Sequence, residues 1–198
     1  MNAFIKKTYR LLTLTAFALI AVIGCEDNPA DPGDENEQEL ITSVTLNLIE
    51  LDAAGNPTAT AVSVNFKDPD GTGGTAPTIG TLTLKAGKNY KGTIALLDET
   101  KNPAESITDE VKAEAEAHQF FYTAKDGAIG RLAVTITDKD ANNRPVGLEY
   151  AVVVSAGANA IGKLNVALSH YEPASKKDGV TRSDESDIDI DFTVNITN

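Results

Sequence analysis

The stretch that decides the fold class is residues 41–51, which read Ile-Thr-Ser-Val-Thr-Leu-Asn-Leu-Ile-Glu-Leu. Apolar and polar side chains alternate along most of it, which is typical of a strand with one buried face. The alternation recurs in residues 61–66, 79–84, 90–97, 132–137, 148–154, 164–168 and 188–196. Turn-forming residues separate most of these stretches. We therefore predict a mainly β fold, an antiparallel, immunoglobulin-like β-sandwich of about seven to nine strands.

One segment has a different pattern. Residues 107–119 are rich in alanine and glutamate, with Thr108 as a suitable N-cap and Asp109 and Glu110 in the first turn. We predict one short crossover helix near residues 107–118. The aromatic run at residues 120–122 should follow it as a buried strand.

The beginning of the chain has the layout of a bacterial lipoprotein signal peptide. Three basic residues precede an uncharged, mostly apolar stretch at residues 11–24. That stretch is shorter than the roughly 20 apolar residues of a membrane-spanning helix. It ends in Val-Ile-Gly-Cys at residues 22–25, which resembles a lipobox. We predict that residues 1–24 are a signal peptide and that Cys25 carries the lipid, thioether-linked diacylglycerol with a further acyl chain such as palmitate.

The residues after this cysteine are expected to be a tether. Residues 25–39 are acidic, contain proline and glycine, and have little to bury, so we predict a lipidated cysteine followed by a disordered acidic tether. Acidic residues at this place also resemble the surface-export signal of Bacteroidota lipoproteins. We predict an outer-membrane, lipid-anchored and surface-exposed protein, with a plain spacer on the periplasmic face as the alternative. Residues 40–198 then form a single β-sandwich domain.

Charge and cysteine content narrow the partners. The chain has a formal net charge of −12 and a single cysteine, Cys25. A strongly acidic domain does not attract nucleic acid, so we predict no nucleic-acid partner. Because a disulfide within the domain is impossible, its own core or a metal ion must stabilise it.

The first candidate site for chemistry lies on the expected helix. Glu110, Glu114 and His118 are spaced four residues apart and would share one helix face. Carboxylate and imidazole groups one turn apart can both bind zinc. His170 is the second of the two histidines and completes the predicted metal site if the fold brings it near. The alternative is an exposed Glu114–His118 pair and an unrelated surface histidine.

A second candidate is a calcium loop. Asp138, Asp140, Asn142 and Glu149 have the spacing of positions 1, 3, 5 and 12 of such a loop. The flanking sequences predict strands rather than helices, and Asp and Asn are also the residues of an ordinary hairpin turn. Calcium at this loop and a metal-free turn therefore both remain open.

A third acidic cluster lies near the end of the chain. Asp187, Asp189 and Asp191 alternate with isoleucine, so they should share one face of a strand. Like charges side by side destabilise a strand without a counter-ion, although a solvated face or a guarded edge strand explains them equally. We find no Gly-x-Ser-x-Gly, His-Glu-x-x-His or phosphate-loop motif, and we predict that the protein is not an enzyme.

Five segments together carry a resemblance to a known family: residues 64–71, 97–105, 116–122, 145–148 and 187–196. They resemble small envelope lipoproteins from Bacteroidota, some of them described as type 1 periplasmic-binding-fold proteins. It implies an envelope lipoprotein that works with a TonB-dependent outer-membrane transporter. A periplasmic-binding fold requires repeated βαβ units, which the alternating strands here do not predict.

These observations give two functional hypotheses. The first is a lipid-anchored, cell-surface binding protein that captures a metal or nutrient for a TonB-dependent transporter, with Zn²⁺ or Ca²⁺ as the metal. The second is a non-catalytic structural or adhesive β-sandwich module. Convergence of the two histidines with acidic residues would favour the first.

Overall fold

The computed structural model describes residues 39–71 and 73–198. The predicted signal peptide, Cys25 and almost all of the predicted tether lie outside the described residues. None of the described helices is long and apolar enough to cross a membrane.

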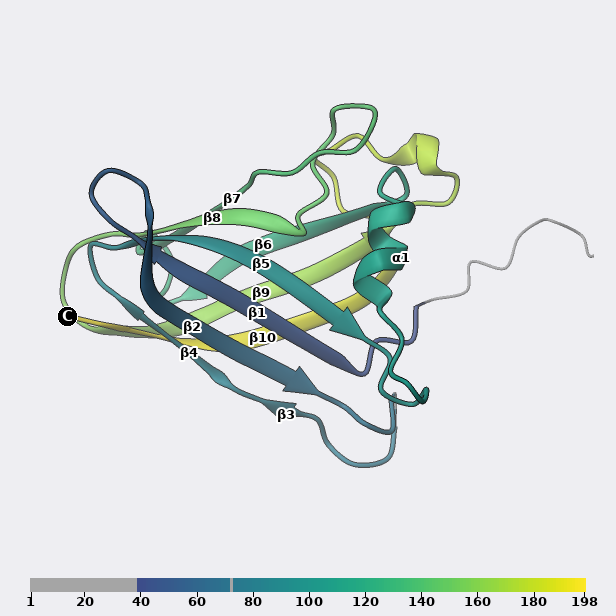
Figure 1. The fold of residues 1–198 in the computed structure, drawn as a ribbon, viewed down its shortest axis with the longest axis horizontal. Helices are drawn as coiled ribbons and strands as arrows, with labels where there is room; N and C mark the ends of the chain where they lie inside the picture. The colour runs from purple at the N-terminus through teal and green to yellow at the C-terminus, as the bar shows by residue number, and fades with distance from the viewer. Residues whose placement is uncertain (1–38, 72) are drawn as a thin grey trace, which may run out of the picture. The chain divides into compact units, whose positions relative to one another are not determined.

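The described chain forms two packed β-sheets (Figure 1), which confirms the predicted β-sandwich. The first sheet has the strand order β3-β2-β1-β5-β8-β7 and the second the order β4-β10-β9-β6. Neighbouring strands are antiparallel except for β4 and β10. The strands are β1 (Ser43–Leu51), β2 (Pro57–Lys67), β3 (Thr78–Ile79), β4 (Thr81–Lys85), β5 (Asn89–Leu97), β6 (His118–Asp126), β7 (Leu132–Ile136), β8 (Glu149–Val154), β9 (Ala160–His170) and β10 (Ser186–Thr197).

The core lies between the two sheets and is built from the alternating apolar residues. In β1, for example, Val44, Leu46 and Leu48 are buried, and in β10 Phe192 and Val194 are buried opposite them in the other sheet. The alternation that predicts strands therefore also separates core residues from surface residues. The buried polar residues discussed below lie at one end of the sandwich.

The stretch at residues 79–84 does not form one strand, as its pattern predicts. It divides at Gly80 into β3 in the first sheet and β4 in the second. A Cβ at Gly80 would lie 2.9 Å from a methyl carbon of Val64 and 3.3 Å from the Asn65 carbonyl oxygen. The close approach of β2 therefore requires glycine where the chain changes sheets.

The crossover helix exists but is shorter than predicted. Helix α1 (Ile107–Ala113) is capped by Ser106, whose hydroxyl accepts from the Asp109 N–H, and not by Thr108. The Thr108 hydroxyl instead bonds to the backbone of Leu96 in β5. The helix ends at Ala113, with Glu114 as its C-cap, because residues 118–126 pair with β9 as β6 and a strand cannot continue the helical backbone. Besides α1, a short 3-10 helix η1 (Ala174–Lys176) lies in the loop between β9 and β10.

Candidate functional site

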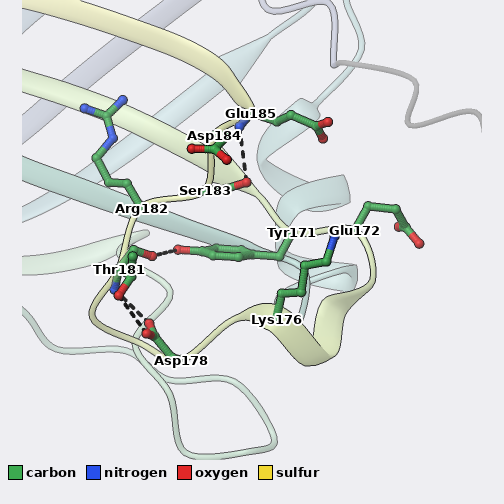
Figure 2. A pocket seen from close by; sticks show the side chains of 9 residues that line it. All are labelled: Tyr171, Glu172, Lys176, Asp178, Thr181, Arg182, Ser183, Asp184 and Glu185. Atoms are coloured by element: carbon green, nitrogen blue, oxygen red, sulfur yellow. Dashed lines mark hydrogen bonds between the residues drawn. The ribbon is translucent and has the colours of Figure 1, made fainter.

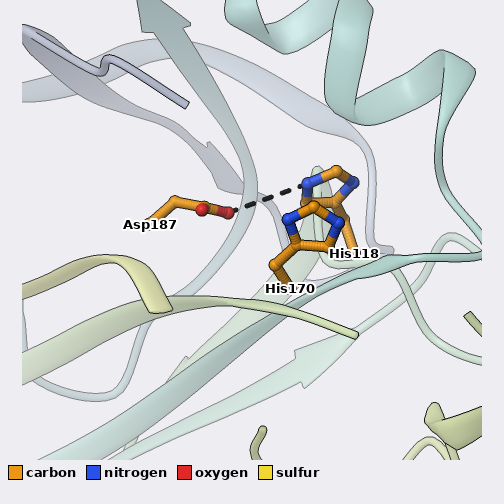
Figure 3. A group of neighbouring side chains, drawn as sticks. All are labelled: His118, His170 and Asp187. Atoms are coloured by element: carbon orange, nitrogen blue, oxygen red, sulfur yellow. Dashed lines mark ion pairs between the residues drawn. The ribbon is translucent and has the colours of Figure 1, made fainter. Parts of the chain in front are cut away.

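Three adjacent strands of the second sheet bring two histidines and an aspartate together (Figure 3). His118 begins β6 and His170 ends β9, and the two residues are direct partners across the antiparallel ladder. Asp187 lies at the start of β10, at an irregularity in the pairing between Ser186 and Ile188. The site therefore depends on the register of β6, β9 and β10.

The two imidazole rings stack, with 4.5 Å between their centroids and 30° between their planes. Asp187 Oδ2 lies 3.7 Å from His118 Nε2, and the two side chains are 2% and 0% exposed. One ligand atom from each of the three residues lies within 4.8 Å of the others. This is slightly wider than a coordination sphere, so a metal ion would draw the three groups together.

Hydrogen bonding assigns a role to each nitrogen of His118. Its Nδ1 lies 3.1 Å from the Glu114 carbonyl oxygen, an acceptor, so Nδ1 carries the proton. Burial lowers the pKa of His118, against the opposing effect of this hydrogen bond, and so favours the neutral ring. Nε2 then presents its lone pair, as in a metal-binding histidine whose other nitrogen donates to a backbone carbonyl.

Three buried polar atoms of this cluster have no hydrogen-bond partner. They are His118 Nε2, His170 Nδ1 and Asp187 Oδ2. A buried polar atom without a partner typically costs about 1–3 kcal/mol. Three such atoms, one from each of three neighbouring residues, are groups that a bound cation could satisfy.

Carboxylates surround the histidines on the side of the helix. Glu39, Glu114 and His118 form a second group whose ligand atoms lie within 4.8 Å of one another. Burial, a hydrogen bond to the Glu110 side chain and the charges of Glu110, Asp187 and Glu114 raise the pKa of Glu39 to about 7. Burial also raises the pKa of Asp187 to about 6, despite a hydrogen bond from the Glu39 N–H. A cation would relieve both effects.

Of the four residues of the sequence-predicted metal site, the structure places Glu114, His118 and His170 in two groups that share His118, and Glu110 in neither group. Glu110 lies in α1 and Glu114 is its C-cap, whereas His118 already belongs to β6. Glu114 and His118 share a group with Glu39, His118 and His170 share one with Asp187, and Glu110 bonds to Glu39. The predicted helix face shared by Glu110, Glu114 and His118 is therefore not formed. The pairing of β6 with β9 determines the position of His118.

Sequence reasoning missed two ligand candidates. Asp187 was predicted on one strand face with Asp189 and Asp191, but only Asp187 reaches the histidines. Asp189 pairs with Arg182, and Asp191 pairs with Lys125 and Lys163. Glu39 is the last residue of the predicted tether, residues 25–39. The run of like-charged aspartates at residues 187, 189 and 191 is the sequence feature that could indicate Asp187. No local pattern indicates Glu39.

The structure does not gather the predicted calcium loop around a common centre. The Asp138 carboxylate accepts from the backbone of Gly147 and Leu148, and Glu149 pairs with Lys91. Asp140 accepts from the backbone N–H groups of Asn142 and Arg144. These oxygens satisfy donors of the chain itself, as in an ordinary Asx turn.

A buried ion pair holds this loop against the candidate site. Lys177 Nζ lies 2.8 Å from Asp140 Oδ2 and 2.7 Å from the Ala115 carbonyl oxygen, and both charged side chains are 0% exposed. Burial lowers the pKa of Lys177. Burial alone would raise the pKa of Asp140, but hydrogen bonds from Lys177 and Arg144 bring it below its usual value. The pair thus connects three segments beside His118.

An open pocket of about 390 Å³ lies next to the site, in the loop between β9 and β10 (Figure 2). Two of its polar side chains are engaged by the same loop. The Tyr171 hydroxyl donates to the Thr181 carbonyl, and Asp178 accepts from Val180 and Thr181, which lowers the pKa of Asp178 to about 2. Among the described residues, the buried polar atoms without a hydrogen-bond partner include three in the histidine cluster and none in the lining of this pocket.

Comparison with known proteins leaves the site to be judged on its geometry. No protein-family model matches the sequence, and no curated protein or solved structure matches it either. The fold and the site together define a β-sandwich domain with a candidate centre of two histidines and surrounding carboxylates that could hold a metal ion.

The pKa of Asp187 gives a testable pH dependence. Its folded value of about 6 lies above the ordinary value of 3.8, so the folded state binds the proton more tightly. The resulting stabilisation of the metal-free domain is complete below about pH 4 and is lost as the pH rises through about 6. Asp187→Asn should therefore raise the free energy of unfolding by up to about 3 kcal/mol at pH 7.5, with little effect at pH 4.

Urea denaturation across this pH range, with a chelator present, measures the effect. Asp189→Asn is the matched control. Its carboxylate pairs with Arg182 and its pKa is lowered, so this change should not stabilise the domain at pH 7.5. Equal responses of the two variants would contradict the assignment of Asp187 as an unfavourably buried charge.

The buried ion pair predicts a second stability effect. Lys177→Met should lower the free energy of unfolding by about 3–5 kcal/mol, because it leaves Asp140 buried without its counter-ion. Lys176→Met, at the exposed neighbouring lysine, should change it by less than about 0.5 kcal/mol. Similar values for the two variants in urea denaturation would show that the pair does not hold the loop.

Proposed function

We propose that this protein is a lipid-anchored envelope protein that binds a divalent transition-metal ion at His118, His170 and Asp187. The observation that carries the proposal is the grouping of His118, His170 and Asp187. Each offers a ligand atom within 4.8 Å of the others, and each has a buried polar atom without a hydrogen-bond partner. Unrelated buried polar groups usually find partners of their own. A single ion would satisfy all three.

The donor set indicates the class of metal. Two imidazole nitrogens and carboxylate oxygens suit Zn²⁺ and neighbouring first-row ions such as Mn²⁺ or Fe²⁺. Ca²⁺ and Mg²⁺ prefer a shell made entirely of oxygen. The single cysteine, Cys25, is not among the site residues, so the thiolate ligands typical of Cu⁺ sites are not part of this set. Zn²⁺ is therefore the first ion to test.

The setting of this function rests on the sequence. The lipoprotein-like leader and the resemblance to Bacteroidota envelope lipoproteins support a place at the outer membrane. On the same grounds we propose a TonB-dependent transporter as the receiver of the metal. We propose binding rather than catalysis, since the side chains of His118 and Asp187 are only 0% and 2% exposed.

Thermal unfolding of the chelator-treated protein tests the proposal. Zn²⁺ at a hundredfold excess over its Kd should stabilise the folded state by about 2.7 kcal/mol and raise Tm by several degrees. His118→Ala should abolish the rise, and Asp187→Asn should reduce it strongly. Asp191 lies on the same strand as Asp187 and its carboxylate pairs with Lys125 of β6, so Asp191→Asn should leave the rise in Tm unchanged.

Two outcomes would contradict the proposal. A Tm that no transition metal raises would leave a structural or adhesive module. A rise with Ca²⁺ alone, lost in Asp138→Asn, would place the metal at the loop beginning with Asp138.

A further inference from the structure

The ligand atoms of the inner site, defined as His118, His170 and Asp187, are difficult to reach from solvent. The side chains of His118 and Asp187 are 0% and 2% exposed. A hydrated ion must lose water molecules before it can contact both of them. A buried metal site therefore needs a route along which other ligands replace the lost water.

The second group of ligand atoms lies on the way to the surface. We call Glu39, Glu114 and His118 the outer group, since Glu114 is exposed and Glu39 is half-buried, whereas His118 is buried. An open pocket of about 250 Å³ is lined by both Glu39 and Asp187. The two carboxylates of the outer group can thus meet a cation that is still partly hydrated.

His118 belongs to both groups and is the member that they share. Its Nε2 atom is buried and has no hydrogen-bond partner, whereas its Nδ1 atom donates to the Glu114 carbonyl oxygen, so Nε2 is the nitrogen whose lone pair is open to an ion. Among the described residues, no single group with ligand atoms within 4.8 Å of one another contains Glu39 and Glu114 together with His170 and Asp187. One ion therefore contacts the two sets in succession more easily than all five residues at once.

Carboxylates and imidazoles also differ in the cations that they bind. Oxygen ligands bind cations that keep several water molecules, whereas two imidazoles favour a dehydrated transition metal. Glu110, hydrogen-bonded to Glu39, adds a further carboxylate near the outer group. The negative charge there should raise the local concentration of cations.

We propose that Glu39 and Glu114 form an outer acceptor position that takes a hydrated divalent cation from solvent and passes it through His118 to the inner site. This inference rests on the proposed metal-binding function. It adds that the outer carboxylates govern the rate of metal uptake, whereas the inner residues govern affinity.

Stopped-flow measurement of Zn²⁺ uptake, followed by competition with a fluorescent zinc indicator, tests this division. The double variant Glu39→Gln/Glu114→Gln should lower the association rate constant about fivefold or more, with less than about a twofold change in equilibrium Kd. Glu105→Gln/Glu116→Gln removes the same charge from exposed positions outside both groups, and it should leave the rate nearly unchanged. Asp187→Asn should instead weaken the Kd at least about tenfold.

Three results would overturn the acceptor position. The first is an unchanged association rate in Glu39→Gln/Glu114→Gln. The second is a large loss of affinity in that variant, which would make the carboxylates ligands of the final site. The third is binding of two Zn²⁺ per wild-type chain and one per double variant, which would make the outer group a permanent second site. If the wild-type chain binds no Zn²⁺ in the competition with the zinc indicator, the proposed function fails as well.

Discussion

The antiparallel register between β6 and β9 is the constraint on which the candidate site depends. It places His118 directly opposite His170, and the pairing of β9 with β10 brings Asp187 beside them. A slip by one residue would turn each side chain to the other face of the sheet. Phe120, Leu164 and Leu168 are buried in the core from the same two strands. Burial of this core therefore fixes the geometry of the polar cluster as well.

The cluster is unfavourable for the metal-free fold, and neighbouring interactions offset that cost. Desolvation raises the pKa of Glu39 and of Asp187, and three nearby polar atoms lack partners. The Lys177–Asp140 pair and the bond from Lys177 to the Ala115 carbonyl hold the adjacent segments in place. Binding sites typically contain residues that destabilise the fold, and the interactions of neighbouring residues offset this destabilisation.

Much of the fold could be predicted from the sequence, because alternation at period two is a local pattern. The stretches at residues 41–51 and 188–196 became β1 and β10. The division at Gly80 could not be predicted, since it depends on contact with β2. The helix ends at Ala113 because residues 118–126 pair with β9 as β6. This long-range pairing is not encoded in the local sequence pattern.

The candidate site was predictable in its residue types but not in its geometry. Two histidines in an acidic chain were a compositional clue, and both are in the cluster. Asp187 could not be separated from Asp189 and Asp191 without knowing that Arg182, Lys125 and Lys163 neutralise the other two. The spacing of the Asp138 loop resembled a calcium site because spacing does not reveal which backbone donors the carboxylates already serve.

The most direct test of the central claim is a crystal structure of the zinc-treated protein with data collected on both sides of the zinc absorption edge. The account predicts an anomalous peak at about 2.0–2.2 Å from His118 Nε2, His170 and Asp187. A peak elsewhere, or well-ordered His118 and Asp187 side chains with no peak between them, would contradict it.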